Sequence, residues 1–238
     1  MANPYFRFKK FTIHHDKCAM KVGTDAVLLG AWVETDYCRN ILDVGTGSGV
    51  IALMLAQRSQ AEIDAIDIDK EACVQAMENA AASPFAGRIK VIHASCADFA
   101  AFAKQKRYDL IVSNPPYFIN SLKCPDNKRT VARHTDTLLI SDLIRDARTL
   151  LSPSGRISLV LPYERLDEVK ELALINQLHI CRQTDVIPTP GAEPKRLLVE
   201  LSVTEENTKK RDILTIEEAR HQYTPEYIAL TKEFYMKM

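Results

Sequence analysis

Apolar and polar positions between residues 40 and 162 follow two alternating periods. Five short runs are apolar throughout or alternate with polar residues, as is typical of strands: Asn40–Gly45, Ala61–Asp67, Ile89–Ala94, Tyr108–Ser113 and Gly155–Leu161. Three longer segments carry helix formers or apolar residues at helical spacing: Ser48–Gln57, Lys70–Ala82 and Thr137–Leu151. The alternation predicts right-handed βαβ units, and hence a parallel sheet covered by helices on both faces.

The pattern changes after residue 162. Glu164–Gln177 has a helical pattern, and the strand-like runs His179–Ile187 and Arg196–Val203 are joined by the turn-rich TPGAEP, which predicts an antiparallel pair. The stretch EENTKKRD is polar and expected to be exposed, and a last helix is predicted after the N-cap residue Thr224 and the proline that follows it. Together these runs predict an α/β fold with a seven-stranded, mostly parallel sheet whose last strand is antiparallel.

Composition excludes several classes of protein. The chain has 238 residues, of which 46% are hydrophobic and 26% charged, so it suits one folded domain and is not intrinsically disordered. No apolar run approaches the ~18 residues of a membrane span, and the start MANPYFRFKKF lacks the apolar region of a signal peptide. The six cysteines include no CxxC pair, and His14-His15 has no third partner, so neither a disulfide framework nor a metal site is expected. We expect a cytoplasmic protein with no obligate protein partner.

A glycine-rich loop, DVGTGSG at residues 43–49, joins the first predicted strand to the next helix. Glycines let the backbone adopt positive φ and approach a ligand, and the free N–H groups of a helix start favour polar or anionic ligands. The spacing of Asp43, Gly45, Gly47 and Gly49 resembles motif I of class I S-adenosylmethionine-dependent methyltransferases rather than the GxGxxG dinucleotide fingerprint. The resemblance implies a Rossmann-like fold that binds S-adenosylmethionine through these residues; a purely structural turn is the alternative.

Three further acidic residues follow predicted strands. Asp67 ends the second strand, about 20 residues after the loop, where a carboxylate can accept both hydroxyl hydrogens of a ribose. Asp69 competes for this role, and either residue can instead cap a helix. Asp98 follows the third strand and can meet the adenine amino group of the cofactor, with a surface loop acid as the alternative.

The tetrad Asn114-Pro115-Pro116-Tyr117 stands at the end of the fourth predicted strand, where ligands bind in open α/β sheets. It resembles motif IV of the amino-methyltransferases, which act on the exocyclic amine of adenine or cytosine or on a glutamine amide. The Asn114 side-chain oxygen and the Pro115 carbonyl can each accept one N–H of such an amine, while the two prolines stiffen the backbone. Tyr117 can stack on the base and Phe118 can close its other side. The alternative is a turn that only ends a strand.

The N-terminal sequence narrows the resemblance. FKKF at residues 8–11 and MKVGTDAVLLGAW at residues 20–32 look like the N-terminal signature of the bacterial tRNA adenine-N6 methyltransferases, which modify the adenine beside the anticodon of a valine tRNA; KRLLVE at residues 195–200 extends the likeness. In that family the segment before motif I packs over the cofactor, which implies that Lys21, Gly23, Thr24 and Asp25 lie near its methionine part. Residues 1–39 are then an extension over the cofactor and substrate side. Residues 40–238 are the methyltransferase domain, with a core at 40–162 and a strand pair and C-terminal helix at 163–238.

The formal net charge of zero hides two basic segments. Residues 1–25 hold 5 basic and 2 acidic side chains, and residues 114–160 hold 7 and 4. Both segments flank the proposed site and suit phosphate contacts. The expected tRNA-binding cations are Lys9, Lys10, Lys123, Lys128, Arg129 and Arg133, each with a solvated surface residue as the alternative.

Four other functions remain open from the residues alone. A protein-glutamine methyltransferase shares the NPPY motif but usually carries a helical N-terminal domain, for which residues 1–39 leave little room. A DNA adenine methyltransferase usually adds a target-recognition domain. An rRNA base methyltransferase and a non-catalytic RNA-binding module are the other two, although both intact motifs disfavour the last.

Overall fold

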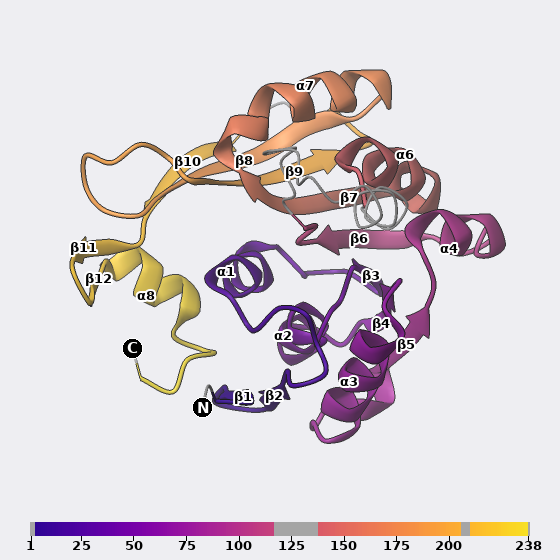
Figure 1. The fold of residues 1–238 in the computed structure, drawn as a ribbon. Helices are drawn as coiled ribbons and strands as arrows, with labels where there is room; N and C mark the ends of the chain where they lie inside the picture. The colour runs from indigo at the N-terminus through magenta and orange to yellow at the C-terminus, as the bar shows by residue number, and fades with distance from the viewer. Residues whose placement is uncertain (1–2, 117–137, 206–209, 238) are drawn as a thin grey trace, which may run out of the picture.

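The computed structural model describes residues 3–116, 138–205 and 210–237, which include a central sheet of eight strands (Figure 1). Along the sheet the order is β10-β8-β9-β7-β6-β3-β4-β5. The strands are β3 (Asn40–Val44), β4 (Glu62–Asp67), β5 (Ile89–His93), β6 (Tyr108–Ser113), β7 (Leu151–Pro162), β8 (His179–Ile187), β9 (Arg196–Ser202) and β10 (Lys210–Thr215).

Strands β5, β4, β3, β6 and β7 run parallel to one another, and β9 runs antiparallel to both β7 and β8. The predicted α/β class, the parallel core and the antiparallel β8–β9 pair are therefore confirmed. The chain builds β4 and β5 on one side of β3 and then crosses to β6 on the other side. The carboxyl ends of β3 and β6 thus flank the topological switch point, where open α/β sheets bind their ligands.

The sheet has one strand more than the sequence predicts. β10 pairs in parallel with β8 at the edge of the sheet, with Lys210 opposite Arg182 and Thr215 opposite Ile187. Its first four residues are exposed, as expected for this polar stretch, and only Leu214 is buried. An edge strand that covers a single apolar position does not show the hydrophobic alternation from which strands are predicted, which is why this strand was missed.

Helices cover both faces of the sheet (Figure 1). One face carries α1 (Thr24–Trp32), α2 (Val50–Arg58), α3 (Lys70–Ala81) and α8 (Pro225–Thr231), and the other carries α4 (Cys96–Phe102), α6 (Ile140–Leu150) and α7 (Leu166–Ile175). Successive residues of a strand point to opposite faces, so Ile41 packs into one apolar cluster while Leu42 and Val44 pack into the other. The short α4 was not predicted, and α6 begins at Ile140, three residues later than its pattern suggested.

The two ends of the chain pack together beside α1 and α2. Strands β1 (Tyr5–Arg7) and β2 (Thr12–His14) form a hairpin, and the Lys9 N–H at its tip donates to the Phe234 carbonyl at 2.8 Å. α8 begins as predicted, because the Thr224 side chain accepts a hydrogen bond from the Tyr227 N–H at 3.2 Å. The remaining elements are η1 (Ala86–Arg88), η2 (Tyr163–Arg165) and the hairpin of β11 (Glu217–Ala219) and β12 (Gln222–Tyr223). In the described part of the chain, no helix is long and apolar enough to cross a membrane.

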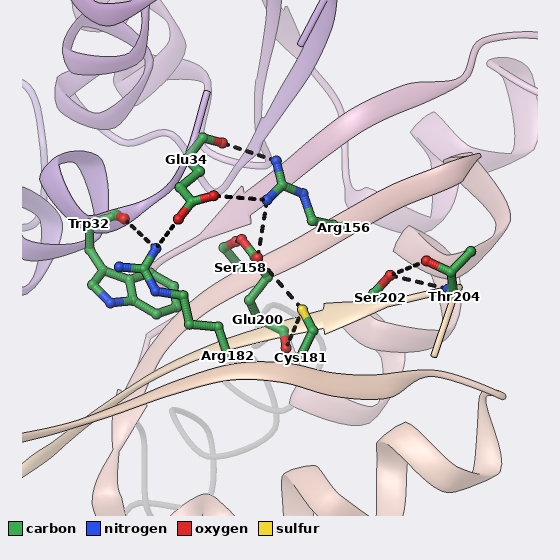
Figure 2. Close-up of polar contacts among 9 residues, drawn as sticks. All are labelled: Trp32, Glu34, Arg156, Ser158, Cys181, Arg182, Glu200, Ser202 and Thr204. Carbon is green, nitrogen blue, oxygen red and sulfur yellow. Dashed lines mark hydrogen bonds and ion pairs between the residues drawn. The ribbon is translucent and has the colours of Figure 1, made fainter. Parts of the chain in front are cut away.

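A buried polar cluster fixes the C-terminal end of α1 to the sheet (Figure 2). Glu200 on β9 is 3% exposed and accepts hydrogen bonds from Arg156 at 3.2 Å and from Ser158 at 2.8 Å, both on β7. Arg182 on β8 lies over the Trp32 ring at 4.2 Å from its centroid and donates to the Trp32 carbonyl at 3.0 Å. Arg182 thus joins α1 directly to β8, and Arg156 on β7 donates to the Glu34 carbonyl, just after the helix, at 3.2 Å.

Candidate active site

The glycine loop leaves β3 and enters α2 through three left-handed residues. The φ angles are +71° at Gly45, +55° at Gly47 and +83° at Gly49, a region that other residues rarely adopt. A Cβ atom on Gly45 or Gly47 would meet nothing within 4 Å, whereas one on Gly49 would lie 3.3 Å from the Ala76 Cβ. Gly49 therefore lets α2 and α3 approach each other, while Gly45 and Gly47 border the open space that a bound ligand needs.

Asp43 is fully buried beneath this loop. Its Oδ2 atom accepts hydrogen bonds from the Thr46 hydroxyl at 2.7 Å and the Ala52 N–H at 3.2 Å, while Oδ1 has no partner among the described residues. Burial raises the pKa of Asp43 to about 7, and the two hydrogen bonds oppose the rise. Since buried polar atoms are normally paired, the unpartnered oxygen beside the loop fits a ligand with a donor or a positive charge.

The structure distinguishes the two acids that compete at the end of β4. The Asp67 carboxylate accepts the Gly47 N–H at 2.8 Å through Oδ2 and the Asp69 N–H at 2.9 Å through Oδ1. The Asp69 carboxylate caps α3 by accepting the Glu71 N–H at 2.9 Å and the Ala72 N–H at 3.5 Å. Asp67 therefore lies against the glycine loop, and Asp69 is the N-cap of a helix.

Asp98 lies in the first turn of α4 rather than in a surface loop. Ser95 is the N-cap residue of this helix. Its hydroxyl donates to Asp98 Oδ2 at 2.7 Å and accepts the Asp98 N–H at 3.1 Å. One carboxylate oxygen of Asp98 is thus engaged at the helix start, directly beyond β5 and two strands away from the glycine loop.

Asn114 follows β6 immediately beside the glycine loop. Ser113, the last residue of β6, is aligned with Val44, the last residue of β3, and the Ser113 hydroxyl donates to the Val44 carbonyl at 2.7 Å. Pro115 is buried, and Asn114 and Pro116 are half-buried. Two motifs about 70 residues apart in the sequence therefore lie at adjacent strand ends, as expected for a switch point. Tyr117 and Phe118 lie outside the described residues.

The start of α1 lies at the same edge of the sheet. Gly23 is the N-cap residue and Thr24 opens the helix, while Lys21 precedes it as an exposed residue. The Asp25 carboxylate accepts a hydrogen bond from the Arg196 Nε at 2.8 Å. Arg196 begins β9 opposite the end of β7, so this ion pair ties the N-terminal end of α1 to the carboxyl edge of the parallel strands.

The predicted cations Lys9 and Lys10 occupy a different end of the molecule. They form the tip of the β1–β2 hairpin, where the Lys9 ammonium donates to the Lys232 carbonyl. Gln57, near the C-terminal end of α2, binds the adjacent Glu233 carbonyl at 3.0 Å. α2 starts at the glycine loop and leads away from it, so the hairpin tip is separated from the loop by the length of this helix. The predicted Lys123, Lys128, Arg129 and Arg133 lie outside the described residues.

Two residues at this edge were missed by sequence analysis. Ser113 is fully buried and joins the ends of β6 and β3. Asn79 of α3 is 2% exposed and donates to the Ser48 carbonyl in the glycine loop at 2.8 Å. Asn79 did carry a signal, because a polar residue at a buried position of an amphipathic helix needs a hydrogen-bonding partner.

A cavity of about 570 Å³ lies away from the glycine loop and opens at the amino ends of β4 and β6, beside Glu62, Lys106 and Tyr108. The one buried carboxylate in its wall, Asp64, already accepts hydrogen bonds from the Lys106 ammonium and the Tyr108 hydroxyl, both at 2.5 Å. This carboxylate is therefore already engaged by groups of the protein.

Three features lie together at the carboxyl edge of the sheet: the GxGxG loop, an acidic residue at the end of the next strand, and Asn-Pro-Pro beyond β6. This combination defines a class I S-adenosylmethionine-dependent methyltransferase. Solved structures share the fold. A predicted O-methyltransferase from Agrobacterium tumefaciens aligns with a TM-score of 0.65 at 23% identity, covering 88% of this chain and 96% of that one. A T. thermophilus 16S rRNA N2 G1207 methyltransferase in complex with AdoMet and guanosine aligns with a TM-score of 0.58 at 17% identity, covering 85% and 52%.

Sequence relatives narrow the class. Residues 18–183 match the model of the methyltransferase small domain. The tRNA1(Val) (adenine(37)-N6)-methyltransferase of Parabacteroides distasonis is 60% identical over 238 residues, and that of Bacteroides fragilis is 49% identical over 241, each match covering 100% of both chains. This chain belongs to the family of the tRNA1(Val) (adenine(37)-N6)-methyltransferases, and its cofactor is S-adenosylmethionine.

Proposed function

We propose that this protein transfers a methyl group from S-adenosylmethionine to the exocyclic N6 of adenine 37 in a valine tRNA, the reaction for which its relatives are named. One observation carries the chemistry of the proposal. The Ser113–Val44 hydrogen bond joins the strand ends that carry Asn114 and the glycine loop. A methyl donor in the loop and an amine at Asn114 would therefore be neighbours.

The cofactor site would use the residues around the glycine loop. Gly45 and Gly47 border open space, Asp43 offers an unpartnered carboxylate oxygen, and Asp67 lies against the Gly47 N–H. We assign Asp67 to the ribose hydroxyls, because its carboxylate lies against the glycine loop, whereas that of Asp69 caps α3. Asp98 would reach the adenine with its second carboxylate oxygen, and Lys21 and Thr24 would lie near the methionine part.

The target amine would be held at Asn114. An exocyclic amine is a weak nucleophile because its lone pair is delocalised into the ring. The Asn114 side-chain oxygen and the Pro115 carbonyl would each accept one of its N–H groups, which orients the lone pair towards the methyl group and increases its electron density. The sulfonium of the bound cofactor supplies that methyl group as an electrophile. The target nitrogen would gain the methyl carbon as the bond from that carbon to sulfur breaks, and its extra proton would leave for solvent. Catalysis would be mainly positioning and electrostatics.

The RNA would lie across the carboxyl edge of the sheet. Tyr117 and Phe118 follow the catalytic prolines directly, and stacking of a base on an aromatic ring contributes about 1–3 kcal/mol. The cations between residues 123 and 133 come next in the sequence and would bind phosphates. Residues 1–39 would act as the extension over the cofactor and residues 40–238 as the methyltransferase domain. A tRNA substrate fits a cytoplasmic location.

Mass spectrometry of nucleosides from cells that lack this protein tests the proposal. We expect N6-methyladenosine to disappear from one valine tRNA and to return with the wild-type gene but not with Asn114→Ala. Asn114→Ala should lower kcat by about 10²–10³, the usual effect of removing one preorganised hydrogen-bonding group, and should leave cofactor binding intact. Unchanged tRNA with under-methylated ribosomal RNA would favour an rRNA base methyltransferase. Unchanged tRNA with an under-methylated protein glutamine would favour the glutamine N5 methyltransferase.

A further inference from the structure

Helix α3 buries two amide side chains on the face that it turns towards the N-terminal segment. Gln75 and Asn79 are each 2% exposed and stand four residues apart, so they share one face of the helix. A buried amide without partners would destabilise the fold. The partners of these two side chains therefore indicate what they hold in place.

Asn79 joins the N-terminal segment to the glycine loop. Its Oδ1 accepts the His14 N–H at 2.9 Å, and its Nδ2 donates to the His14 carbonyl and to the Ser48 carbonyl, both at 2.8 Å. All three partners are backbone groups. One side chain thus binds both backbone polar groups of His14, at the end of β2, and the carbonyl of Ser48, the fourth residue of the GTGSG sequence.

Gln75 holds the chain three residues further on. Its Oε1 accepts the Lys17 N–H at 3.2 Å, and its Nε2 donates to Glu78 at 3.3 Å. Together the two amides anchor the chain at residues 14 and 17. Residues 16–23 then lead to the start of α1. We call residues 16–23 the covering segment.

The covering segment passes beside Asp67. Cys18, in this segment, is half-buried, and burial together with the nearby charges of Asp67 and Asp69 raises the pKa of its thiol to about 11. Asp67 in turn accepts the Gly47 N–H. The covering segment and the glycine loop therefore both lie beside Asp67, and the chain runs on from Cys18 through Lys21 to Thr24 at the start of α1.

We infer that Asn79 and Gln75 are positioning residues: they hold the covering segment across the bound cofactor and so set cofactor affinity without touching the cofactor. The inference rests on the proposed function, which places S-adenosylmethionine beside Asp67 and the glycine loop. It accounts for two buried amides on one face of the helix, where apolar side chains could be buried without a desolvation cost.

The first test measures binding of S-adenosylhomocysteine and steady-state kinetics. Asn79→Leu should raise the Kd and the KM for S-adenosylmethionine by about tenfold, equivalent to the loss of one or two net hydrogen bonds, while kcat at saturating cofactor changes by less than about threefold. Gln75→Leu should raise both constants less, because it keeps the link to Ser48. Gln183→Leu is the matched control: it removes another buried amide, one that binds Asp185 on β8, and it should leave the Kd unchanged.

The second test uses native thiols as reporters. Bound S-adenosylhomocysteine should slow alkylation of Cys18 by about tenfold relative to Cys38, a second half-buried thiol, which lies beside Arg156. In Asn79→Leu this protection should fall several-fold even at saturating ligand. If ligand does not protect Cys18 in the wild type, the proposed cofactor site is wrong. If it protects wild type and Asn79→Leu equally, with equal Kd values, the site stands and the positioning role is refuted.

Discussion

Asp43 shows how one residue can couple the fold to pH. Its carboxylate is fully buried and accepts only two hydrogen bonds, so burial dominates and raises its pKa from 3.8 to about 7. The folded protein therefore keeps a proton on Asp43 in a pH range where the unfolded chain has lost it. Between pH 4 and 7 the folded state binds more protons than the unfolded state, so this residue's contribution to the free energy of unfolding falls as pH rises.

Asp43→Asn should remove this dependence. Asparagine is of similar size and keeps an oxygen for Thr46 and Ala52, but it has no charge to bury. We expect the free energy of unfolding of the wild type, minus that of Asp43→Asn, to fall by on the order of 3–4 kcal/mol between pH 4 and 8. Urea unfolding of both proteins across this range measures the difference. A difference that does not change with pH would show that Asp43 has an ordinary pKa.

The two acids at the end of β4 give a matched pair of substitutions. Asp67→Asn should raise the KM for S-adenosylmethionine by more than about tenfold, because the Asp67 carboxylate would bind the ribose through charge-assisted hydrogen bonds. Asp69→Asn should change it less than about twofold, because asparagine caps helices as well as aspartate. Steady-state kinetics with fixed tRNA distinguishes them. The assignment of the ribose to Asp67 fails if Asp69→Asn has the larger effect.

At the scale of elements, α1 is held at both ends. Arg196 binds Asp25 near its first turn, and Arg182 stacks on Trp32 at its last turn. Arg182 and Arg156 also bind Glu34, just after the helix, as Figure 2 shows. The N-terminal end of α1 lies at the carboxyl edge of the sheet, where we propose that the cofactor binds, so these contacts at the opposite end would help to position the site.

The ion pair between Arg156 and Glu200 is the most buried part of this support, with side-chain exposures of 19% and 4%. Glu200→Leu should lower the free energy of unfolding by about 3–5 kcal/mol, because it removes the buried carboxylate that neutralises the mostly buried Arg156 guanidinium and leaves only the exposed Glu34 beside it. The double variant Arg156→Met with Glu200→Leu should recover most of that loss, since apolar pairs often replace buried ion pairs without penalty. Urea unfolding of the wild type, the two single variants and the double variant gives the coupling free energy between Arg156 and Glu200. Additive losses would mean that solvent already screens the pair.

At the scale of the molecule, the parts of the site that could be predicted depend on topology. Strand runs and right-handed crossovers were enough to bring Asp43 and Asn114 to one edge, because the ends of parallel strands meet there. The N-cap at Thr224 was readable for a similar reason, since it depends only on neighbouring residues. Asn79, in contrast, acts through His14 and Ser48, which are remote in sequence, so its role appears only when the chain is folded. The edge strand β10 was missed because its neighbour, rather than its own hydrophobic pattern, stabilises it.

The distribution of positive charge over the whole molecule predicts where the phosphates of the tRNA bind. Lys9 and Lys10 lie at the hairpin tip, separated from the glycine loop by the length of α2, whereas the cations of residues 123–133 follow soon after the Asn-Pro-Pro-Tyr tetrad in the sequence. Neutralising Lys123, Lys128, Arg129 and Arg133 to glutamine should reduce the slope of log K against log salt for tRNA binding by about 3, at ~0.7–0.9 per phosphate contact. The double variant Lys9→Gln, Lys10→Gln should change this slope by less than about 1. Binding titrations at several salt concentrations measure both slopes. If the hairpin variant loses more of the slope, the RNA extends around the molecule to the far end of α2, and the carboxyl edge is not the main phosphate contact.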